Sequence, residues 1–584
     1  MSDSRPYGLS GEQLRALDPR IRLVEAGPGA GKTRTVVARL RSNFEDGRRV
    51  AMLSFTNAAV DVARLRGRDV PQLLEAPNFV GTFDAFFRRY VVTPATIRSG
   101  GRPPTYLASW DDLRNSMAVV RPDNGGVGIR LTRFVQQKGV WAIDVDLLSR
   151  MERLAWEKLT DWSRQNLNTI GHQRITALRK AQVYDTTSAR KRALEILDLA
   201  ESPLPLLVRR FNEIIIDEFQ DCDEIEHNIV HRLSSAGISV VAVADPDQAI
   251  YEFRQANSTL YEQYRNGVAE EERVVLSTCY RSSPVICSVI NSLRTVGLGQ
   301  IVPDVDHAGG STGVHVVVGS GVKAGACAYK ILRECGVSLT RTRVIAHRKS
   351  DARSLLRTGK EPPHGSSQVE MLLVPLADLR SGADPSGRMR AIRRVESFVL
   401  SQFDWDGRGL EGRNEQIVEL GVASEELRGI ASALLKASLT WTDSISCKAE
   451  LRSILEGFAS RTQVGLRPRL GNRLTIPEKV WDFWTSRTLG LIDDVPDALR
   501  WGHVHGVKGD EFQAVIMAIP AKTSGSSHVL DDWQGGINSE QRRVLYVGVS
   551  RAMQELVLVV PPSRRVQLEA VLADANIEYT VTVA

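Results

Sequence analysis

The stretch "VEAGPGAGKTRTV", residues 24–36, constrains the fold of this chain more than any other short segment. An apolar run ends at Ala26, a glycine-rich turn follows, and a helical pattern begins near Lys32. In a strand, loop and helix of this kind, the loop amides and the positive end of the helix point at one place and hold a phosphate group. The usual signature has glycine where Ala26 stands. The predicted loop consists of Ala26, Gly27, Pro28, Gly29, Ala30, Gly31, Lys32 and Thr33.

A second segment, "EIIIDEFQD" at residues 213–221, supplies the acidic groups that a phosphate loop needs. Asp217 follows an apolar strand, where it is placed to hold Mg²⁺, and Glu218 is placed to activate an attacking water. Lys32 then supplies charge for the β and γ phosphates, and Thr33 supplies a hydroxyl for the metal. Each motif alone has a plainer interpretation, a glycine-rich turn or a solvated strand end. Together they indicate a nucleotide site.

Short apolar runs, each leading into a turn or a helical pattern, recur along the chain. Continuous apolar strands followed by helices are typical of parallel sheets covered on both faces, so the fold class is α/β with enough strands for two sheets. Two long stretches between these runs have helical spacing and read as insertions. The predicted strands are 21–26, 49–55, 213–218, 238–245, 314–318, 341–347, 514–519 and 556–560.

Composition excludes several classes of protein. The hydrophobic fraction of 42% and the charged fraction of 25% are those of an ordinary globular protein, which argues against a disordered or fibrous chain. The net charge of +6 is a mild excess that favours a nucleic-acid partner. Neither a signal peptide nor a run of 18 apolar residues is found, so we expect a cytoplasmic protein without a membrane partner. The six cysteines include no C-x-x-C pair, which predicts free thiols rather than disulfides or a zinc site.

With alanine in its first position, "AGPGAGKT" followed by "DEFQD" resembles the UvrD/Rep/PcrA-like group of superfamily 1 DNA helicases. That resemblance implies ATP and Mg²⁺ as cofactors and two RecA-like parallel-sheet lobes, each interrupted by a largely helical accessory insertion. We predict the first lobe at 1–89 and 206–276 around an insertion at 90–205, and the second lobe at 277–369 and 497–584 around an insertion at 370–496. Further strings match the family in its order: "LSGEQLRAL", "LSFTNAAV", "GTFDAFF", "ADPDQAIYEFRQA", "CYRSS", "VIAHRKSDARS", "HGVKGDEF" and "EQRRVLYVGVSRAMQEL".

The resemblance assigns roles around ATP. Gln13 would contact the base edge, Arg34 would pack near the adenine, Tyr280 would stack on it, and Glu511 would lie near the ribose. Gln248 would sense the γ-phosphate, while Arg281 and Arg551 would act as arginine fingers. The predicted catalytic residues are therefore Lys32, Asp217, Glu218, Gln248, Arg281 and Arg551, with Thr33 and Asp217 at the metal.

Because the resemblance places both arginines in the second lobe, hydrolysis would require the lobes to close on ATP and reopen afterwards. Two lobes that alternate their grip on a strand can step along it.

The same resemblance implies contacts to single-stranded DNA, with aromatic rings that stack on bases without sequence preference. The alternative for each ring is a place in the core. Three positions depart from the family pattern, Asp84 for His, Ala244 for Gly and His503 for a hydroxyl residue, and they bear on the grip on DNA rather than on hydrolysis. The predicted DNA-binding residues are Phe55, Thr56, Asn57, Thr82, Phe83, Tyr251, Phe253, Arg254, Arg348 and His505.

The leading hypothesis is an ATP-dependent DNA translocase and helicase that moves 3′ to 5′ and acts on single-stranded DNA and on junctions with duplex. The alternative is a DNA-sensing ATPase subunit of a nuclease-containing assembly, such as a Gabija-type anti-phage defence system, with little unwinding of its own. An RNA-directed relative is a third interpretation, although nothing here resembles an RNA-binding module. Residues 552–584 are too few for a fused nuclease, so we expect a nuclease or repair protein to be a separate partner.

Overall fold

The computed structural model describes residues 8–584 except 56, 114, 122–127, 138, 251–257, 296–297, 305–312, 339–340, 357–368, 381–384, 406–412, 489–499 and 524–526. The chain folds into two compact units. The first spans Met1–Gly310, Lys508–Glu511 and Gly525–Met553, and the second spans Ser311–Val507, Phe512–Ser524 and Gln554–Ala584.

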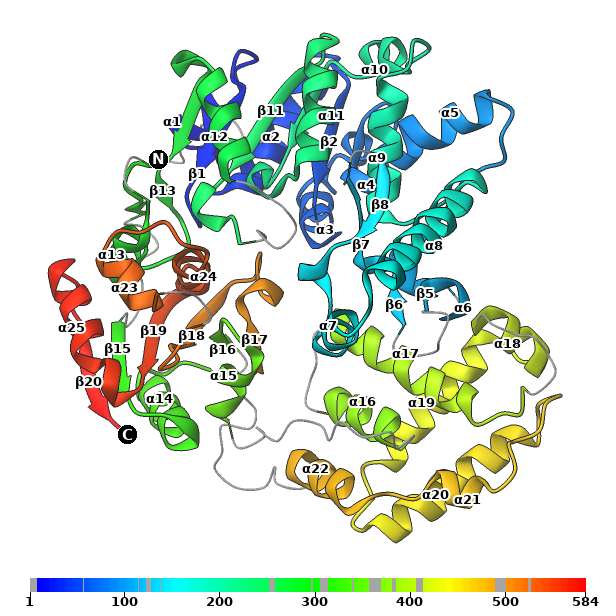
Figure 1. The fold of residues 1–584 in the computed structure, drawn as a ribbon. Coiled ribbons are helices and arrows are strands. Elements are labelled where there is room, and N and C mark those ends of the chain that lie inside the picture. Colours follow the sequence, from blue (N-terminus) through cyan, green and yellow to red (C-terminus); the bar gives the residue numbers. More distant parts are fainter. Residues whose placement is uncertain are drawn as a thin grey trace. The chain divides into compact units, whose positions relative to one another are not determined.

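A six-stranded sheet is the centre of the first unit, and all its pairings are parallel. Figure 1 shows its strands in blue and green. The four residues of β1 and the four of β10 are all buried, as expected for strands covered on both faces. In sheet order the strands are β12 (Arg273–Leu276), β1 (Leu23–Ala26), β11 (Ser239–Ala244), β10 (Glu213–Ile216), β2 (Val50–Ser54) and β3 (Phe79–Thr82).

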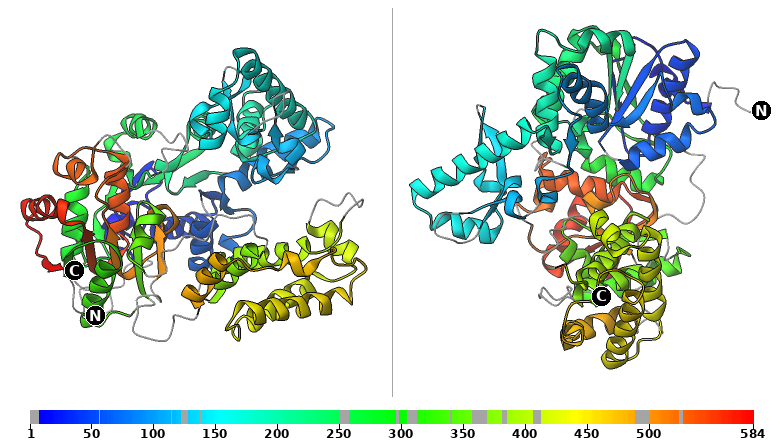
Figure 2. Two further views of the ribbon diagram at one scale, coloured as in Figure 1. Left: turned by 60° about the horizontal axis from the view of Figure 1, so that its bottom comes forward. Right: turned by 90° about the vertical axis from the view of Figure 1, so that its right-hand side faces the viewer.

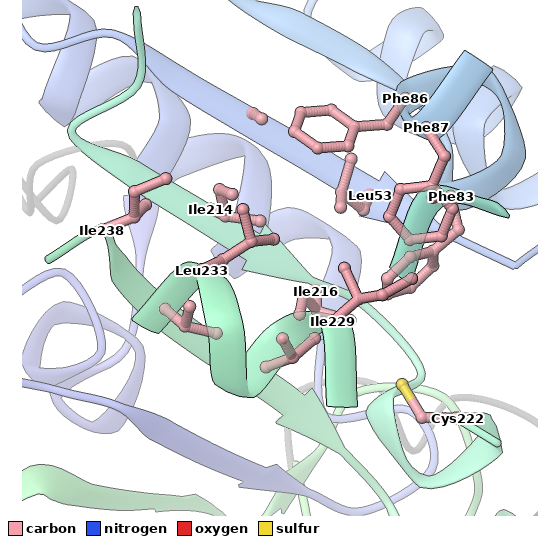
Figure 3. Packing of buried hydrophobic residues seen from close by; sticks show 14 of the residues in the cluster. Leu53, Phe83, Phe86, Phe87, Ile214, Ile216, Cys222, Ile229, Leu233 and Ile238 are labelled. Carbon is pink, nitrogen blue, oxygen red and sulfur yellow. The ribbon is translucent and has the colours of Figure 1, made fainter. Parts of the chain in front are cut away.

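Alternating side chains of this sheet enter two separate cores, because successive strand residues point to opposite faces. Ile214 and Ile216 of β10 belong to one core, while Ile215 between them belongs to the other. Figure 3 shows the first core, where Ile214 and Ile216 pack with phenylalanines such as Phe86 and with Leu233. The helices of the first core are α4 (Phe83–Phe87), α9 (Thr186–Leu197), α10 (Leu204–Arg210), α11 (Glu224–Ser235) and α12 (Ser258–Gly267), and those of the second are α2 (Lys32–Glu45) and α3 (Asn57–Arg66).

The stretch predicted as the first insertion is mostly helical but also contains short paired strands. A small core around Trp110 and Trp141 holds these pieces together. Its helices are α5 (Thr93–Arg98), α6 (Asn115–Ala118), α7 (Arg150–Glu157) and α8 (Asp161–Lys180), followed by α9 and α10. The paired strands are β4 (Thr105–Tyr106) with β9 (Val183–Tyr184), β5 (Val119–Val120) with β6 (Ile129–Arg130), and β7 (Phe134–Gln137) with β8 (Val140–Ile143).

Several shorter elements complete the first unit. They come from separate parts of the sequence and lie in the same unit as the first sheet. These elements are α1 (Gly11–Arg15), β13 (Thr278–Cys279), β14 (Val302–Pro303), α13 (Pro284–Leu293), α23 (Val529–Gln534) and α24 (Glu540–Val549).

A second six-stranded sheet is the centre of the second unit. Strand β15 pairs in parallel with β19 and β20, and β16 pairs in parallel with β17 and β18. In sheet order the strands are β17 (Arg500–His503), β16 (Thr342–Ala346), β18 (Phe512–Ala518), β19 (Ala552–Val560), β15 (Gly313–Val318) and β20 (Thr580–Val583). Its helices are α14 (Gly321–Glu334), α15 (Lys349–Ser354) and α25 (Arg565–Asp574).

The second unit also contains a group of helices with a core of its own. Buried residues such as Phe398, Trp441 and Trp484 fill that core. Figure 2 shows these helices, in yellow and orange, grouped together in both of its views. They are α16 (Glu370–Arg380), α17 (Pro385–Ser401), α18 (Arg413–Leu420), α19 (Ser424–Ala437), α20 (Ser444–Ala459), α21 (Leu470–Arg473) and α22 (Glu478–Thr488).

The predicted α/β class with two parallel sheets is confirmed, and each of the eight predicted strands is present. Four strands of these sheets were missed: β3, β12, β17 and β20. All six cysteines are free thiols in the structure. No helix in the described ranges is both long and apolar enough to cross a membrane.

Candidate nucleotide site

A cavity of about 400 Å³ opens in the first unit at the carboxyl ends of the sheet strands. Its volume lies in the range of small-molecule sites. The residues that the sequence analysis assigned to ATP and catalysis line it, with the exception of Ala26. The predicted residues among its lining are Gln13, Gly27, Pro28, Gly29, Ala30, Gly31, Lys32, Thr33, Arg34, Asp217, Glu218, Gln248, Tyr280, Arg281, Glu511 and Arg551.

The loop between β1 and α2 has the backbone of a phosphate cradle. Gly29 and Gly31 have φ angles of 74° and 79°, in the left-handed region that side chains other than glycine rarely adopt. Gly31 is the N-cap of α2, so the helix begins at Lys32 with its first amides directed toward the loop. The Lys32 Nζ lies 3.5 Å from the Ala26 carbonyl oxygen and 4.0 Å from Asp245 Oδ2.

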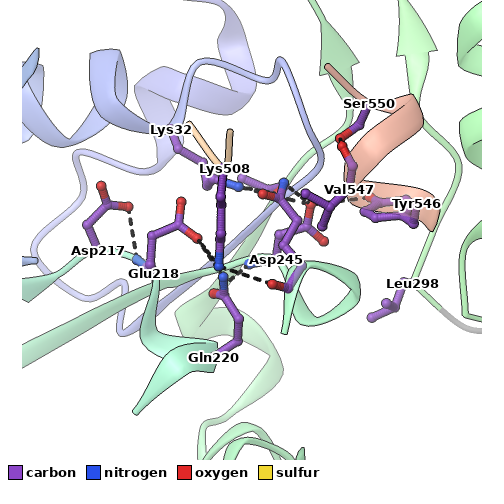
Figure 4. Close-up of polar contacts among 12 residues, drawn as sticks. Lys32, Asp217, Glu218, Gln220, Asp245, Leu298, Lys508, Tyr546, Val547 and Ser550 are labelled. Carbon is purple, nitrogen blue, oxygen red and sulfur yellow. Dashed lines mark hydrogen bonds and ion pairs between the residues drawn. The ribbon is translucent and has the colours of Figure 1, made fainter. Parts of the chain in front are cut away.

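Two adjacent carboxyl groups follow β10 and differ in their electrostatics (Figure 4). Burial and then the neighbouring Glu218 raise the pKa of Asp217 to about 7. Burial opposes ionisation of Glu218 too, but Lys508 and then Lys32 outweigh it and lower the pKa of Glu218 to about 2. Glu218 has a φ of 57°, and its Oε2 accepts a hydrogen bond of 2.6 Å from Gln220 Nε2. One carboxylate of the pair is therefore charged and held in place.

Lys508 was not singled out from the sequence, although it stands in the quoted string "HGVKGDEF". Its Nζ lies 2.5 Å from Asp221 Oδ2 and 3.4 Å from Glu218 Oε2, and it donates to the Gln248 carbonyl oxygen at 3.0 Å. Figure 4 shows this lysine reaching the acidic strand end. The string marks Lys508 as a residue of a family motif. It does not show which groups Lys508 contacts, because these partners are about 260 to 290 residues away in sequence.

Arg551 and Gln248 meet inside the cavity. Arg551 Nη2 donates to Gln248 Oε1 at 3.3 Å, and Arg551 Nε donates to the Val547 carbonyl oxygen at 3.1 Å. Burial and then the nearby Arg281 lower the pKa of Arg551 to about 10. Arg551 remains charged at neutral pH, so a cation is fixed beside the residue predicted to sense the γ-phosphate.

Asp245 and Tyr546 were also missed by the sequence analysis. Asp245 Oδ2 accepts from Gln248 Nε2 at 2.8 Å and from the Tyr546 hydroxyl at 3.2 Å. Both residues are buried. Asp245 orients the Gln248 side chain, and Tyr546 holds Asp245 in place. The contact of Tyr546 joins distant parts of the sequence and could not be read from a short string.

The residues predicted to contact the base and ribose already have partners within the protein. Gln13 is buried, donates from Nε2 to the Ala30 carbonyl oxygen at 3.0 Å and accepts from the Ser10 amide at 3.1 Å. Arg281 donates from Nε to Glu511 Oε1 at 2.9 Å and from Nη1 to the Ser550 carbonyl oxygen at 3.1 Å. Both arginines that the resemblance assigns to the second lobe lie in the first compact unit.

The groups at the acidic strand end fit a hard cation. Asp217 and Thr33 line the same cavity and offer carboxylate and hydroxyl oxygens, the donors that Mg²⁺ prefers. The raised pKa of Asp217 reflects a second negative charge beside a buried carboxyl, which a cation would relieve.

One residue predicted to bind DNA has a different place in the structure. Phe83 is only 2% exposed and packs in the core with Phe86 and Phe87. Its ring is not open to a base, so the prediction that Phe83 stacks on DNA is corrected to a packing role. The ring was misassigned because a phenylalanine after a strand has the same sequence signal whether it faces solvent or core.

The other predicted DNA residues are divided among several places. Phe55 is half-buried, lies 4.9 Å from the Phe83 ring centroid and lines the nucleotide cavity, while the Thr82 hydroxyl caps α4. In the second unit, Arg348 is the N-cap of α15 and the His505 ring lies 6.2 Å from that of His347. Thr56, Tyr251, Phe253 and Arg254 and the side chain of Asn57 lie outside the described residues.

Asp84, which departs from the family pattern, belongs to a partly buried ionic network. Arg190 of α9 contacts Asp84 at 2.8 Å, Asp223 at 3.5 Å and Glu226 at 3.0 Å. Burial lowers the pKa of Arg190, but Glu226 and Asp84 outweigh it, so the net direction is upward. The network joins the start of α4 to α11, which follows the acidic strand end.

Comparison with known proteins supports the resemblance to UvrD-like helicases. Residues 9–269 match the family model described as the UvrD/REP helicase N-terminal domain. These residues, which make up less than half of the chain, are similar to the N-terminal domain of UvrD/REP helicases. The matched segment holds the phosphate loop, Asp217, Glu218 and Gln248, whereas Arg281, Lys508 and Arg551 lie beyond it.

Curated relatives agree with this family. The chain is 24% identical over 331 residues to the ATP-dependent DNA helicase UvrD1 of Mycobacterium leprae, a match that covers 51% of this chain and 42% of that protein. It is 23% identical over 604 residues to DNA helicase II of Escherichia coli K12, covering 93% of this chain and 82% of that protein. The chain thus spans about two fifths of the first relative's length and most of the second's.

Proposed function

We propose that this chain is an ATP-dependent DNA helicase that hydrolyses ATP in the cavity of the first unit. The observation that carries the proposal is the meeting of Lys32, the Asp217–Glu218 pair, Gln248 and Arg551 around one cavity. These groups come from segments up to about 500 residues apart and include the cations, carboxylates and amide that phosphoryl transfer to water requires. The names of the relatives, ATP-dependent DNA helicase and DNA helicase II, support the same activity.

Charged groups of the cavity have distinct roles in this reaction. The loop amides at the start of α2 and the Lys32 ammonium hold the phosphates. Glu218, kept ionised by Lys508 and oriented by Gln220, accepts the proton of the attacking water. Arg551 and Arg281 neutralise the charge that develops on the transferred group, an effect worth roughly 10³ to 10⁵ in rate for an arginine finger.

Asp217 and the Thr33 hydroxyl are the residues that would hold Mg²⁺. When bound, the metal supplies charge neutralisation between the β and γ phosphates.

The proposed substrate is single-stranded DNA and its junction with duplex, and the proposed direction is 3′ to 5′. Support comes from the family of the matched domain and from the strings that resemble strand-binding segments. Partners of the nuclease or repair class belong to the same proposal.

A strand-displacement assay on duplexes with a 3′ or a 5′ single-stranded tail tests the proposal. We expect ATP-dependent displacement of the 3′-tailed duplex, none with the 5′ tail, and loss of activity in Glu218→Gln, which keeps the size of the side chain. Displacement only from the 5′ tail would overturn the direction. ATP hydrolysis stimulated by DNA without displacement of either duplex would favour a DNA-sensing ATPase subunit of a nuclease-containing assembly.

A further inference from the structure

Three side chains with metal-binding atoms meet at the sheet of the second unit. His315 stands on β15, Glu555 on β19, and Cys335 caps the C-terminus of α14. Their ligand atoms all lie within 4.8 Å of one another. In the sheet register Gly313 lies opposite Glu555, and His315 follows two residues later on the same face.

The His315 ring is held from both sides. Its Nδ1 lies 2.8 Å from the Thr580 hydroxyl of β20, and its Nε2 lies 2.9 Å from Glu555 Oε2. The Cys335 Sγ lies 3.9 Å from the same Nε2. A partner on Nδ1 that fixes the ring while Nε2 faces other ligands is the arrangement found around histidines that bind metals.

Glu555 carries an unexplained polar atom. Its side chain is 1% exposed, and its Oε1 has no hydrogen-bond partner among the described residues. A buried carboxylate oxygen without a partner costs free energy unless something else satisfies it. A side chain at Gly313 would fill the space beside this group, since a Cβ there would come within 2.8 Å of His315 Nε2 and 3.0 Å of Glu555 Oε2.

We propose that His315, Cys335 and Glu555 bind a zinc ion, with a fourth position open to solvent. An imidazole, a thiolate and a carboxylate are the ligand types that zinc takes at roughly 2.0–2.3 Å. A ligand set of three protein groups leaves the fourth tetrahedral position free. The half-buried Cys335 provides the route of entry from solvent.

Binding of zinc replaces the proton of the Cys335 thiol, and that proton passes to the buffer. Neutral His315 binds through Nε2 and keeps its one ring proton on Nδ1, where the Thr580 hydroxyl accepts it. The ion then takes over the contact that now joins His315 to Glu555.

The site would connect the consecutive elements β15 and α14 to β19, which is distant in sequence. His315 and Glu555 are 240 residues apart, and the strand and helix that carry His315 and Cys335 are consecutive. A bound ion would fix the end of α14 against β15 and β19, which stabilises the second unit. This inference does not depend on the proposed helicase activity.

Cobalt is the probe for the test, because a thiolate bound to Co²⁺ gives a charge-transfer band that imidazole or carboxylate ligands alone do not. The untagged full chain is stripped with a chelator and titrated with Co²⁺ and then with Zn²⁺, without nucleotide. We expect one thiolate-bound metal per chain in the wild type. Cys335→Ser should lose the band and bind Zn²⁺ at least tenfold more weakly, whereas Cys327→Ser, which removes a thiol from the same helix, should change neither.

Thr580→Val tests the support of the ring, and we expect Zn²⁺ affinity to fall about 10- to 100-fold. If Cys335→Ser does not fold, alkylation of the wild type decides instead: Zn²⁺ should protect Cys335 but not Cys327 from iodoacetamide. Absence of the charge-transfer band in the wild type, its persistence in Cys335→Ser, or equal alkylation of Cys335 with and without Zn²⁺ would each overturn the proposal.

Discussion

Lys508 controls the charge of the acidic strand end. Its ammonium is the main opposite charge acting on Glu218, and it also contacts Asp221 at 2.5 Å. Without it, burial would act on Glu218 with less opposition and raise the pKa of that carboxyl. The ionised fraction at a given pH would fall, so hydrolysis would require a higher pH.

We therefore expect Lys508→Met to move the acidic limb of the pH–rate profile upward and to lower the turnover number for ATP on the acidic side of that profile. Lys330→Met, which removes an exposed lysine of α14, is the control. Steady-state ATP hydrolysis between pH 5 and 9 gives the result. An acidic limb that stays at the wild-type pH would contradict the role given to Lys508.

His227 gives the first unit a dependence on pH. Its ring packs on Phe219 at 4.8 Å between centroids, and burial lowers its pKa from 6.5 to about 4. The folded state therefore keeps His227 neutral, while the unfolded chain takes up a proton as the pH falls below about 6.5. Stability is lost between pH 6.5 and about 4, with a loss of roughly 2–3 kcal/mol from this group.

His227→Gln should remove this part of the pH dependence. Thermal unfolding of the wild type, His227→Gln and the exposed-site control His231→Gln, followed from pH 7 to pH 4, measures it. The wild type and His231→Gln should lose stability in parallel, and His227→Gln should lose less. Three parallel curves would show that the ring is not held neutral by the fold.

Residue roles could be predicted where the chemistry lies in one short string. Lys32, Asp217 and Glu218 stand in such strings, and the structure brings them to one cavity. Asp245 and Tyr546 could not be found in this way, because their contact joins residues 301 positions apart. For Phe83 the string was informative about position in the chain but not about which face of α4 is covered.

At the scale of elements, Gly29 is the point where the phosphate loop touches the segment of Cys279 and Arg281. A Cβ at Gly29 would come within 2.7 Å of both Cys279 Sγ and Arg281 Cβ. At Gly47, which has a similar φ of 70°, a Cβ would meet nothing within 4 Å. Alanine at Gly47 would therefore cause backbone strain alone, whereas alanine at Gly29 would cause backbone strain and a steric clash.

Alanine at either glycine should cost about 1–2 kcal/mol of stability through its left-handed backbone. Only Gly29→Ala should also weaken ATP binding, by at least about tenfold, because it pushes the loop away from its neighbours. Calorimetric titration with a non-hydrolysable ATP analogue compares the two variants. Equal affinities would mean that the loop adapts without loss.

The helix after the loop is fixed to the acidic strand by a buried ion pair. Arg39 of α2 contacts Glu213 of β10 through Nε at 2.8 Å and through Nη2 at 2.7 Å, and both side chains are at most 3% exposed. Asn43 adds a hydrogen bond of 3.0 Å to Glu213 Oε1. The contact fixes the start of β10 against α2. It therefore also helps to hold the phosphate loop, which precedes α2, near Asp217, which follows β10.

Arg39→Met should lower the free energy of unfolding of the first unit by about 3 kcal/mol, because the buried Glu213 would keep only the Asn43 hydrogen bond and the more distant Arg48, whose Nη2 lies 4.0 Å from Oε2. Arg41→Met, on the same helix, breaks a partly exposed pair with Asp69 and should change stability little. Urea unfolding followed by circular dichroism gives the comparison. A double variant, Arg39→Met with Glu213→Leu, should lose less than Arg39→Met alone, and a larger loss would argue against the charge as the cause.

At the scale of the molecule, the order of strands and helices could be read from apolar runs, and eight predicted strands were found. Among the missed strands, β20 is mostly exposed, and β17 has the sequence RWGH, which is not an apolar run. The paired strands near Trp141 were also missed, since two- to four-residue strands have too few positions to show a period. The proposed zinc cluster runs against the sequence prediction, which argued from the lack of a C-x-x-C pair that the cysteines form no zinc site.

The central claim is that the cavity hydrolyses ATP in response to DNA. The most direct test is the rate of ATP hydrolysis with and without single-stranded DNA, with Lys32→Ala as the blank. We predict that DNA strongly raises the rate and that Lys32→Ala abolishes hydrolysis in both conditions. A rate indifferent to DNA, or one that survives in Lys32→Ala, would contradict the account.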